Sequence, residues 1–243
     1  MTGAGISTDA GIPDFRGPNG VWTRNPAAER LSTLDAYLED VEVRRTAWRN
    51  RLGSPVWNAC PTAGHDALVE LERQGRLSFV ITQNTDGLHQ RAGQDPSRVL
   101  ELHGTAHYTD CWSCGNRTAT AAVLERVRAG EDDPHCTVRV AGEHACGGVL
   151  KSATISFGQS LDPETLDRAA RAASNAEVLL AIGTTLEVHP AAGLVPLARR
   201  SGAAIVIVNG SPTALDSLAD IVIRGSISAV LPRLVPGQAS APG

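Results

Sequence analysis

Residues 79–104 read FVITQNTDGLHQRAGQDPSRVLELHG, and this stretch decides the predicted fold. Its two short apolar runs, residues 79–82 and 99–102, have the length and composition of buried strands. Polar side chains follow both runs directly, and they are Gln83, Asn84, Asp86 and His103. Because the carboxyl ends of parallel strands meet at one edge of a sheet, we expect these groups to share one crevice. The stretch therefore predicts a cofactor site that carries its own base.

A glycine-rich turn, residues 3–7, stands near the start of the sequence and reads GAGIS. Such a turn binds phosphate when it leads into a helix N-terminus, and it normally follows a strand. No strand precedes it in this sequence. A second loop, residues 11–17, carries Phe15 and Arg16. Either it is a surface loop with an Asp14–Arg16 pair, or Arg16 meets phosphate and Phe15 covers a reactive ring.

The composition narrows the class of protein. The 243 residues are enough for one large α/β domain with a small insert, and 42% hydrophobic but only 4% aromatic residues predict an aliphatic core. The net charge is −4, and no basic block marks a nucleic-acid interface. No apolar run approaches the roughly 20 residues of a membrane helix, and no signal-peptide layout is present. We therefore expect a cytoplasmic protein that binds neither nucleic acid nor membranes.

Strand and helix patterns alternate along most of the chain. Helices are expected at residues 26–54, 62–75, 166–173 and 190–200, and further strands at residues 154–157, 178–182, 204–208 and 221–223. Residues 226–234 are expected to close the domain. This alternation predicts a doubly wound parallel sheet of the Rossmann-like class. Two of the strands end in polar or glycine residues that extend the ligand edge, namely Gly183, Thr184, Thr185 and Asn209.

Four of the five cysteines cluster in one region, at Cys111, Cys114, Cys136 and Cys146. In a reducing compartment this clustering indicates a metal site before disulfides. The first two form a CxxC half-knuckle, whereas nine residues separate the second two, which we interpret as an insertion at residues 137–145. His135 and His144 are alternative ligands, but four cysteines are favoured, and a closed ligand set implies structural zinc. The fifth, Cys60, is expected to be a small buried thiol.

The predicted organisation is a large domain interrupted by smaller parts. Residues 1–25, 55–104 and 153–235 form the Rossmann-like domain, residues 26–54 form the helical part of a small domain, and residues 105–152 form the zinc-binding module. Residues 236–243 are expected to be a disordered tail.

Several motifs occur in one order along the chain. They are GAGIST at 3–8, DAGIPDFRG at 9–17, TQNTDGLHQRAG at 82–93, ELHG at 101–104, the four cysteines, FG at 157–158, GTTLEVHPAA at 183–192 and VN at 208–209. In this order they closely resemble the sirtuin family of NAD-dependent protein deacylases. The resemblance implies transfer of an acyl group from protein lysine to ADP-ribose, with release of nicotinamide and O-acyl-ADP-ribose. It also implies acyl-lysine proteins as substrates, and we expect a monomer.

The resemblance also implies roles for individual residues. His103 would be the catalytic base, and one structural zinc ion would be held by Cys111, Cys114, Cys136 and Cys146. NAD would be bound by Gly3, Ala4, Gly5, Ser7, Asp14, Phe15, Arg16, Gln83, Asn84, Asp86, Gly183, Thr184, Thr185 and Asn209.

The sequence departs from the family pattern at its start. The family's first strand and the helix before it are missing, and that strand would lie in the middle of the sheet, beside residues 77–82 and 178–182. Its loss would leave backbone groups unpaired. We therefore expect either a start codon placed too late or a defective protein.

The acyl group is predicted from residues 45–51. Desuccinylating members carry a Tyr-x-x-Arg pair in this helix, and residues 47–51 read AWRNR, without the tyrosine. An acetyl or longer neutral acyl group is therefore expected, although Arg45, Arg49 and Arg51 leave an acidic group open.

Three other functions compete with the deacylase. A mono-ADP-ribosyltransferase would use the same site but would label a protein. A catalytically defective NAD- or zinc-dependent binding protein would release no nicotinamide. A Rossmann dehydrogenase is least favoured, because it gives the cysteines no role and the sequence lacks an acidic residue at the end of a second strand.

Overall fold

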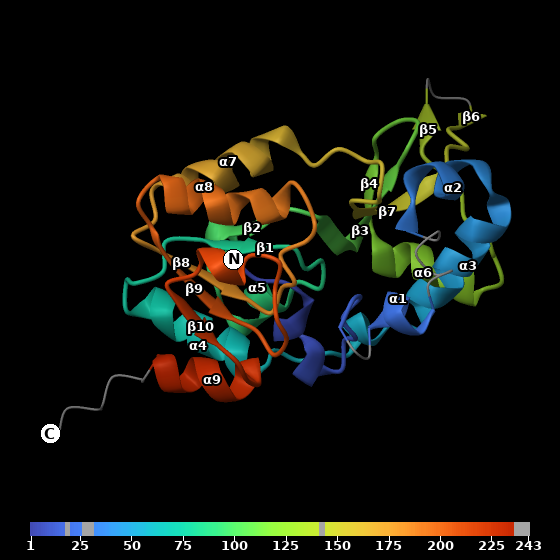
Figure 1. Cartoon of the computed structure of the whole chain (residues 1–243). Coiled ribbons are helices and arrows are strands. Elements are labelled where there is room, and N and C mark those ends of the chain that lie inside the picture. Colours follow the sequence, from blue (N-terminus) through green and yellow to red (C-terminus); the bar gives the residue numbers. More distant parts are fainter. Residues whose placement is uncertain (18–19, 26–31, 141–143, 236–243) are drawn as a thin grey trace, which may run out of the picture.

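A parallel sheet forms the centre of the larger of two lobes in this computed structural model (Figure 1), which describes residues 1–17, 20–25, 32–140 and 144–235. In one part of the sheet, β1 (Val80–Thr82) pairs with β2 (Val99–Glu101). In the other part, β9 (Ala204–Val208) lies between β8 (Val178–Ile182) and β10 (Ile221–Ile223). All these pairs are parallel, so the predicted doubly wound sheet is confirmed.

Thr2 lies between β1 and β8 and joins the two parts of the sheet. It forms isolated parallel bridges with Thr82 and Ile182. The N–H of Thr2 donates to the Ile81 carbonyl at 2.8 Å, and the N–H of Gly3 donates to the Ile182 carbonyl at 3.0 Å. Thr2 therefore occupies the position, between β1 and β8, of the central strand that the family resemblance implies. Because the strand order reverses here, the crevice at this edge is the expected ligand site.

Helices cover both faces of the sheet. As Figure 1 shows, α7 (Pro163–Ser174) and α8 (Leu194–Arg200) lie on one face, and α4 (Ala63–Arg73) and α9 (Ile227–Leu234) on the other. Side chains of β9 alternate between the faces, as the pleat of a strand requires. Ile205 and Ile207 pack in one apolar cluster with Val195 of α8, whereas Val208 packs in the other with Leu231 of α9. Burial on both faces explains the unbroken apolar run of this strand.

The smaller lobe is built on an antiparallel sheet with the order β4-β3-β7. Its strands are β3 (Gly104–Cys111), β4 (Arg117–Ala119) and β7 (Leu150–Thr154), and its helices are α2 (Leu34–Glu39), α3 (Val41–Leu52) and α6 (Thr120–Arg128). Trp48 of α3 is fully buried and packs in one cluster with Leu124 of α6, Leu150 of β7 and two of the clustered cysteines. Cys111 and Cys136 therefore lie in the core of this lobe.

Short elements connect the two lobes and the larger helices. They are α1 (Val21–Arg24), α5 (Leu88–Ala92), β5 (Arg139–Val140), β6 (His144–Ala145) and 3-10 turns at Ala4–Ile6, Thr8–Ala10, Pro55–Trp57, Pro96–Arg98, Ala191–Gly193 and Asp216–Leu218. The glycine-rich turn thus leads into 3-10 turns, not directly into an α-helix. None of the helices in the described ranges has the length and apolarity needed to cross a membrane.

Three expectations about local structure are wrong. The strand expected at residues 154–157 ends at Thr154 and begins at Leu150, and Phe157 forms only an isolated bridge with Thr33. The single helix expected at residues 26–54 is interrupted at Asp40, where α2 ends and α3 begins, and Val41 just after the break is 37% exposed. Cys60 is exposed, not buried.

Asp40 also starts a new helix, since its side chain accepts hydrogen bonds from the N–H groups of Glu42 and Val43 and so caps α3. The predicted helix start at residue 26 and the predicted tail, residues 236–243, lie outside the described residues.

Candidate functional site

Two glycine-containing turns meet at the edge of the parallel sheet. The N–H of Gly5 donates to the Gly183 carbonyl at 2.8 Å, and Gly183 has a positive φ of 62°. A Cβ atom at Gly5 would lie 2.8 Å from the Gly183 Cα, and a Cβ at Gly3 would lie 2.8 Å from the Gly183 carbonyl oxygen. Only glycine allows the two backbones to approach this closely. The predicted residues at 3–5 and at 183–184 therefore lie together.

A buried polar cluster joins the first turn to the end of β1. The Ser7 hydroxyl donates to Asp86 Oδ2 at 2.7 Å. The Asn84 amide donates to Ser7 Oγ at 3.1 Å and to the Gly3 carbonyl at 3.2 Å. Asp86 Oδ1 accepts from the N–H of Leu88 at 2.9 Å. Ser7, Asn84 and Asp86 are all buried, so these bonds fix a carboxylate and an amide beside the crevice.

His103 follows β2 on the same edge. Its Nδ1 lies 3.0 Å from the backbone carbonyl of Gln83, whose side-chain amide donates to Thr184 Oγ1 at 2.9 Å. Since a carbonyl oxygen only accepts, Nδ1 carries the proton, and in the neutral ring Nε2 keeps its lone pair. Burial lowers the pKa of His103, and the bond to Gln83 opposes this only in part. The imidazole is therefore a neutral base near pH 7.

The remaining residues predicted to bind NAD include two that follow strands and one in the loop at residues 11–17. Asn209 follows β9, and its amide donates to the Ser211 carbonyl at 2.8 Å. Thr185 follows β8, and its carbonyl accepts from the N–H of Ala214 at 3.1 Å. Asp14 Oδ1 accepts from the N–H of Gly17 at 3.0 Å and so tightens its loop. Asn209 and Thr185 thus follow neighbouring strands at the same edge of the sheet.

Trp22 connects the loop at residues 11–17 to Phe157, and sequence reasoning missed it. The Phe15 ring, which is 49% exposed, lies 4.7 Å from the Trp22 ring, and the Trp22 ring lies 5.3 Å from that of Phe157. The Arg16 guanidinium lies 5.0 Å from the Trp22 ring centroid. Phe15 and Arg16 therefore both pack on one aromatic ring.

The four clustered cysteines have the geometry of a zinc site. Their sulfurs all lie within 4.8 Å of one another, with Cys111 and Cys146 3.7 Å apart and Cys114 and Cys136 3.8 Å apart. A tetrahedral zinc ion with Zn–S bonds of about 2.3 Å holds its sulfurs about 3.8 Å apart. The residues therefore fit the metal.

The pKa values of two of the thiols are shifted in opposite directions. Burial alone would raise the pKa of Cys111, but N–H donors from Cys114 and Ser113 outweigh it and lower this pKa to about 7. Burial raises the pKa of Cys136 to about 12. Four thiolates this close together repel one another, and a divalent cation offsets that repulsion.

The insertion at residues 137–145 contains a small hairpin that brings the last two cysteines together. Strands β5 and β6 pair antiparallel, and the N–H of Cys146 donates to the Val138 carbonyl at 2.8 Å. His135 Nδ1 lies 2.7 Å from the Gly147 carbonyl, and His144 lies on β6; neither belongs to the cysteine cluster. Among the described residues, the ligand set is thus the favoured four cysteines.

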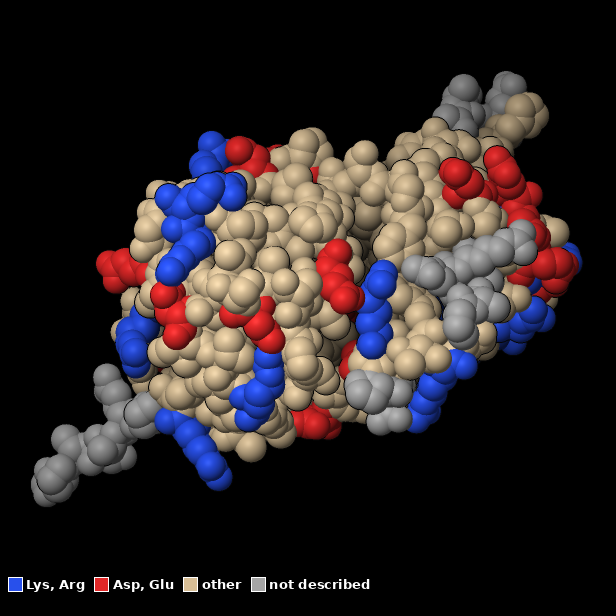
Figure 2. Space-filling view, viewed as in Figure 1, with Lys and Arg blue, Asp and Glu red and all other residues tan. Residues whose placement is uncertain are grey.

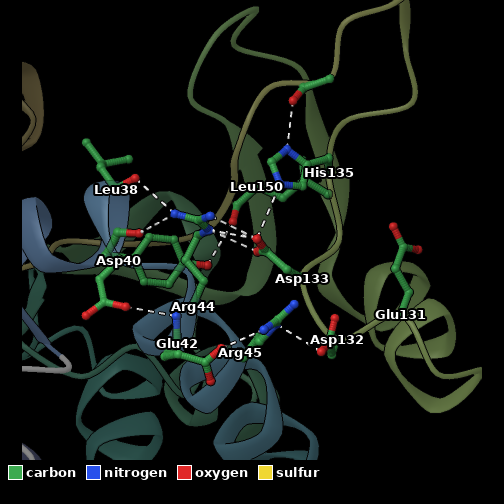
Figure 3. Close-up of polar contacts among 12 residues, drawn as sticks. Leu38, Asp40, Glu42, Arg44, Arg45, Glu131, Asp132, Asp133, His135 and Leu150 are labelled. Carbon is green, nitrogen blue, oxygen red and sulfur yellow. Dashed lines mark hydrogen bonds and ion pairs between the residues drawn. The ribbon is translucent and has the colours of Figure 1, made fainter.

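A buried ion pair fastens α3 to the segment before Cys136 (Figure 3). Arg44 donates to the Asp133 carboxylate from Nε at 2.9 Å and from Nη2 at 2.9 Å. Its Nη1 donates to the Leu38 carbonyl at 2.9 Å, near the end of α2. The two side chains are only 10% and 12% exposed. This clamp holds both helices against the zinc module. It could not be predicted from the sequence, because the partners are 89 positions apart.

The clamp leads to a prediction about stability. Arg44→Met should lower the free energy of unfolding by about 3 kcal/mol, because it leaves the Asp133 carboxylate buried without its partner. The double variant Arg44→Met/Asp133→Leu should recover most of the loss. Arg45→Met is the matched control and should change little, since the Arg45 pairs with Glu42 and Asp132 are exposed. Denaturant unfolding of the zinc-loaded proteins measures all three, and equal stability of Arg44→Met and the parent would contradict the prediction.

Charged side chains are interspersed on the face that Figure 2 shows, with arginines lying among Asp and Glu on both lobes. The same view shows a furrow between the two lobes.

Known proteins resemble the chain over almost its full length. A family model described as "Sir2 family" matches residues 3–190. A Streptomyces coelicolor protein named NAD-dependent protein deacetylase 2 is 51% identical over 237 residues, which cover 98% of this chain and 95% of that protein. A Sir2 structure with a deacetylated p53 peptide and 3'-O-acetyl ADP ribose matches with TM-score 0.86 at 32% identity, over 96% of this chain and 89% of that one. A structure of Sir2Tm bound to a propionylated peptide matches with TM-score 0.82 at 31% identity and the same coverage. The chain therefore belongs to the Sir2 family.

Proposed function

We propose that the protein is an NAD-dependent protein-lysine deacylase that transfers the acyl group to ADP-ribose and releases nicotinamide. The observation that carries this proposal is a neutral, half-buried imidazole at the sheet edge where Ser7, Asn84 and Asp86 form their buried polar cluster. Relatives named NAD-dependent protein deacetylase or deacylase support it.

The residues around the crevice suit the binding of a dinucleotide. The close approach of the turns at Gly3 and Gly183 leaves no side chain between their backbones, and backbone N–H groups of such turns bind pyrophosphate. The fixed Asp86 carboxylate and Asn84 amide offer partners for the ribose and the nicotinamide amide. The residues that we assign to NAD are Gly3, Ala4, Gly5, Ser7, Asp14, Phe15, Arg16, Gln83, Asn84, Asp86, Gly183, Thr184, Thr185 and Asn209.

His103 supplies the base. The ribose of bound NAD would supply an electrophilic carbon, and nicotinamide would depart from that carbon. The Nε2 atom of His103 then takes the proton of a ribose hydroxyl, while the bond from Nδ1 to the Gln83 carbonyl holds the ring in place and stabilises the imidazolium. Phe15, Trp22 and Phe157 form an apolar row beside the loop at residues 11–17, and we propose that this row limits the access of competing water.

The pKa of His103 predicts how activity depends on pH. The protonated ring cannot accept a proton, so kcat/KM should fall at acidic pH. Because burial lowers the pKa of His103 below its ordinary value of 6.5, the midpoint of that fall should lie below pH 6.5. Titration of His103 should therefore cause no change of activity near neutral pH. A profile of kcat/KM for an acetyl-lysine peptide at saturating NAD measures this. A midpoint above 6.5 would contradict it.

We propose a neutral acyl group as the preferred substrate. Arg45 is occupied by Glu42 and Asp132, and the Arg49 guanidinium donates to the Thr46 hydroxyl. Arg51 lies over the Tyr37 and Trp48 rings, 5.7 and 5.2 Å from their centroids. The positions three residues before these arginines are occupied by Glu42, Thr46 and Trp48, so none of them completes a Tyr-x-x-Arg motif. The propionylated peptide in a related structure agrees with a neutral group.

Two experiments test the function and its substrate range. NAD labelled in the adenine ring shows whether the label leaves as O-acyl-ADP-ribose, as proposed, or stays on a protein, as a mono-ADP-ribosyltransferase would leave it. Peptides that differ only in carrying acetyl, propionyl or succinyl groups then rank the acyl chains. Higher kcat/KM for the succinyl peptide would overturn the preference for neutral groups.

We also propose a domain organisation and a cellular location for the protein. The domain ranges 1–25 with 55–104 and 153–235, 26–54, and 105–152 agree with β3 starting at Gly104 and β7 ending at Thr154. A cytoplasmic location suits four cysteines that must stay reduced to bind zinc. The partners are acyl-lysine proteins, and a monomer stays a prediction.

A further inference from the structure

His107 links the smaller lobe to the turn that carries Asp86. It lies on β3, and its Nε2 atom is 2.8 Å from the backbone carbonyl of Asp86. A carbonyl oxygen only accepts, so the imidazole donates its Nε2 proton. The N–H of Ala106 also donates to the Thr85 carbonyl at 2.8 Å. Two successive residues of β3 therefore hold two successive residues of this turn.

The imidazole is fixed by contacts on two further sides. Gly87 has a positive φ of 70°, and a Cβ atom there would lie only 2.7 Å from His107 Nε2, so the ring packs directly on the glycine. The Trp57 ring contacts the imidazole edge-on, with centroids 5.8 Å apart. The Trp57 indole N–H in turn donates to the Arg51 carbonyl at 2.5 Å, at the end of α3. The ring is therefore wedged between the Asp86–Gly87 turn and the helical part of the smaller lobe.

Asp86 is held at three points, and each comes from a different element. Ser7 of the glycine-rich turn binds Oδ2, the N–H of Leu88 at the start of α5 binds Oδ1, and His107 binds the backbone carbonyl. The carboxylate oxygens and the carbonyl belong to one residue, so loss of the His107 bond frees the turn to rotate. A carboxylate that must meet a ligand with a fixed geometry loses affinity when its backbone is free to move.

We propose that His107 is a positioning residue for the nicotinamide end of NAD, acting through Asp86. The proposal rests on the proposed function, which places nicotinamide and its ribose beside Asp86. His107 bonds to the backbone carbonyl of Asp86 and packs on Gly87, and it is assigned no part in the chemistry itself. Through β3 and Trp57 it makes the geometry of the nicotinamide subsite depend on how the smaller lobe packs against the larger one.

The space around His107 allows variants that fold. The ring forms part of the wall of a hollow of about 400 Å³, which Gln90, Glu101, Thr105 and Tyr108 also line. His107→Phe keeps the ring and the Trp57 contact but removes the donor. His107→Gln keeps a donor, because its amide nitrogen is as many bonds from Cα as Nε2 is. Tyr108→Phe is the matched control, since this 46%-exposed neighbour on β3 makes no bond to the turn.

The test is calorimetric titration of each zinc-loaded variant with NAD and with ADP-ribose, which lacks only nicotinamide. For His107→Phe we expect the Kd of NAD to rise roughly tenfold, which corresponds to about 1.4 kcal/mol, while the Kd of ADP-ribose changes less than twofold. His107→Gln should restore most of the NAD affinity, and Tyr108→Phe should match the parent. In turnover assays the change should appear in the KM for NAD more than in kcat.

Three results would overturn the proposal. They are an unchanged Kd of NAD in His107→Phe, an equal loss of NAD and ADP-ribose affinity, and a His107→Gln variant as weak as His107→Phe. The proposed function fails in a different way: a parent protein that binds NAD but forms no O-acyl-ADP-ribose from any acyl peptide contradicts the deacylase alone. A parent protein that binds no NAD would overturn both.

Discussion

Replacement of His103 by Asn is expected to lower the rate of O-acyl-ADP-ribose formation by roughly 10³-fold, within the range that a positioned general base contributes. The reason is specific. The Nδ1 bond to the Gln83 carbonyl leaves Nε2 as the basic nitrogen, and burial keeps the pKa of the ring low enough for it to be neutral. The Asn side chain can still hydrogen-bond, but it has no basic nitrogen to accept a proton. Single-turnover rates with an acetyl-lysine peptide measure the loss.

The same variant should retain the step in which nicotinamide leaves. If the base acts after that departure, His103→Asn still exchanges labelled nicotinamide into NAD when the acyl peptide is present. Thermal stability and zinc content should equal those of the parent, because His103 is only half-buried and lies outside the cysteine cluster. Equal loss of exchange and of product formation would place the role of His103 in NAD binding instead.

Loss of the zinc site has the second-largest expected effect. Cys136→Ser should abolish stoichiometric zinc binding and unfold the smaller lobe, because structural zinc contributes about 10–16 kcal/mol of apparent binding free energy in small zinc modules. That exceeds what the remaining core of the lobe can replace, since Cys111 and Cys136 themselves belong to the cluster around Trp48 and Leu124. Activity should fall below detection, although no sulfur takes part in the chemistry.

The exposed Cys60 supplies the matched control. Cys60→Ser should keep one zinc ion per chain, the parent melting temperature and the parent activity. Metal analysis, circular dichroism and thermal unfolding compare the two variants. Full activity of metal-free Cys136→Ser would show that the zinc module is not needed for the fold of the site.

The parallel sheet was predictable because most residues of its inner strands β8 and β9 are buried or half-buried. The run VLLAI at residues 178–182 and the run AIVIV at residues 204–208 are the observed β8 and β9, residue for residue. An unbroken apolar run of this length between glycine-rich or polar turns is compatible with few structures other than a buried strand of a parallel sheet. The site residues at the ends of these strands were predictable for the same reason, since the sheet fixes where strand ends lie.

Strand β7, in the antiparallel sheet of the smaller lobe, was not predictable in this way. β7 reads LKSAT, and its buried residues include Lys151 and Ser152, which carry no apolar signal. The Lys151 ammonium is satisfied by the Thr154 carbonyl at 2.5 Å, and burial lowers its pKa to about 8. A polar strand of this kind is stabilised by its partner β3, and pairing between distant segments leaves no local pattern.

Contacts within the smaller lobe and between the two lobes could not be predicted from the sequence either. Arg44 and Asp133 are 89 positions apart, and His107 reaches the Asp86 carbonyl across 21 positions. Each of these residues resembles an ordinary surface polar residue in its own neighbourhood. Their roles depend on which backbone and side-chain groups the fold brings opposite them, and that is a tertiary property.

The most direct test of the deacylase assignment is the stoichiometry of products from NAD and an acetyl-lysine peptide, with mass spectrometry of every species. We expect nicotinamide, deacetylated peptide and O-acetyl-ADP-ribose in equal amounts, and no nicotinamide when the unmodified peptide is used. Nicotinamide release that does not depend on the acetyl group, ADP-ribose attached to a protein, or no turnover by the folded, zinc-loaded protein with any acyl peptide would contradict the assignment.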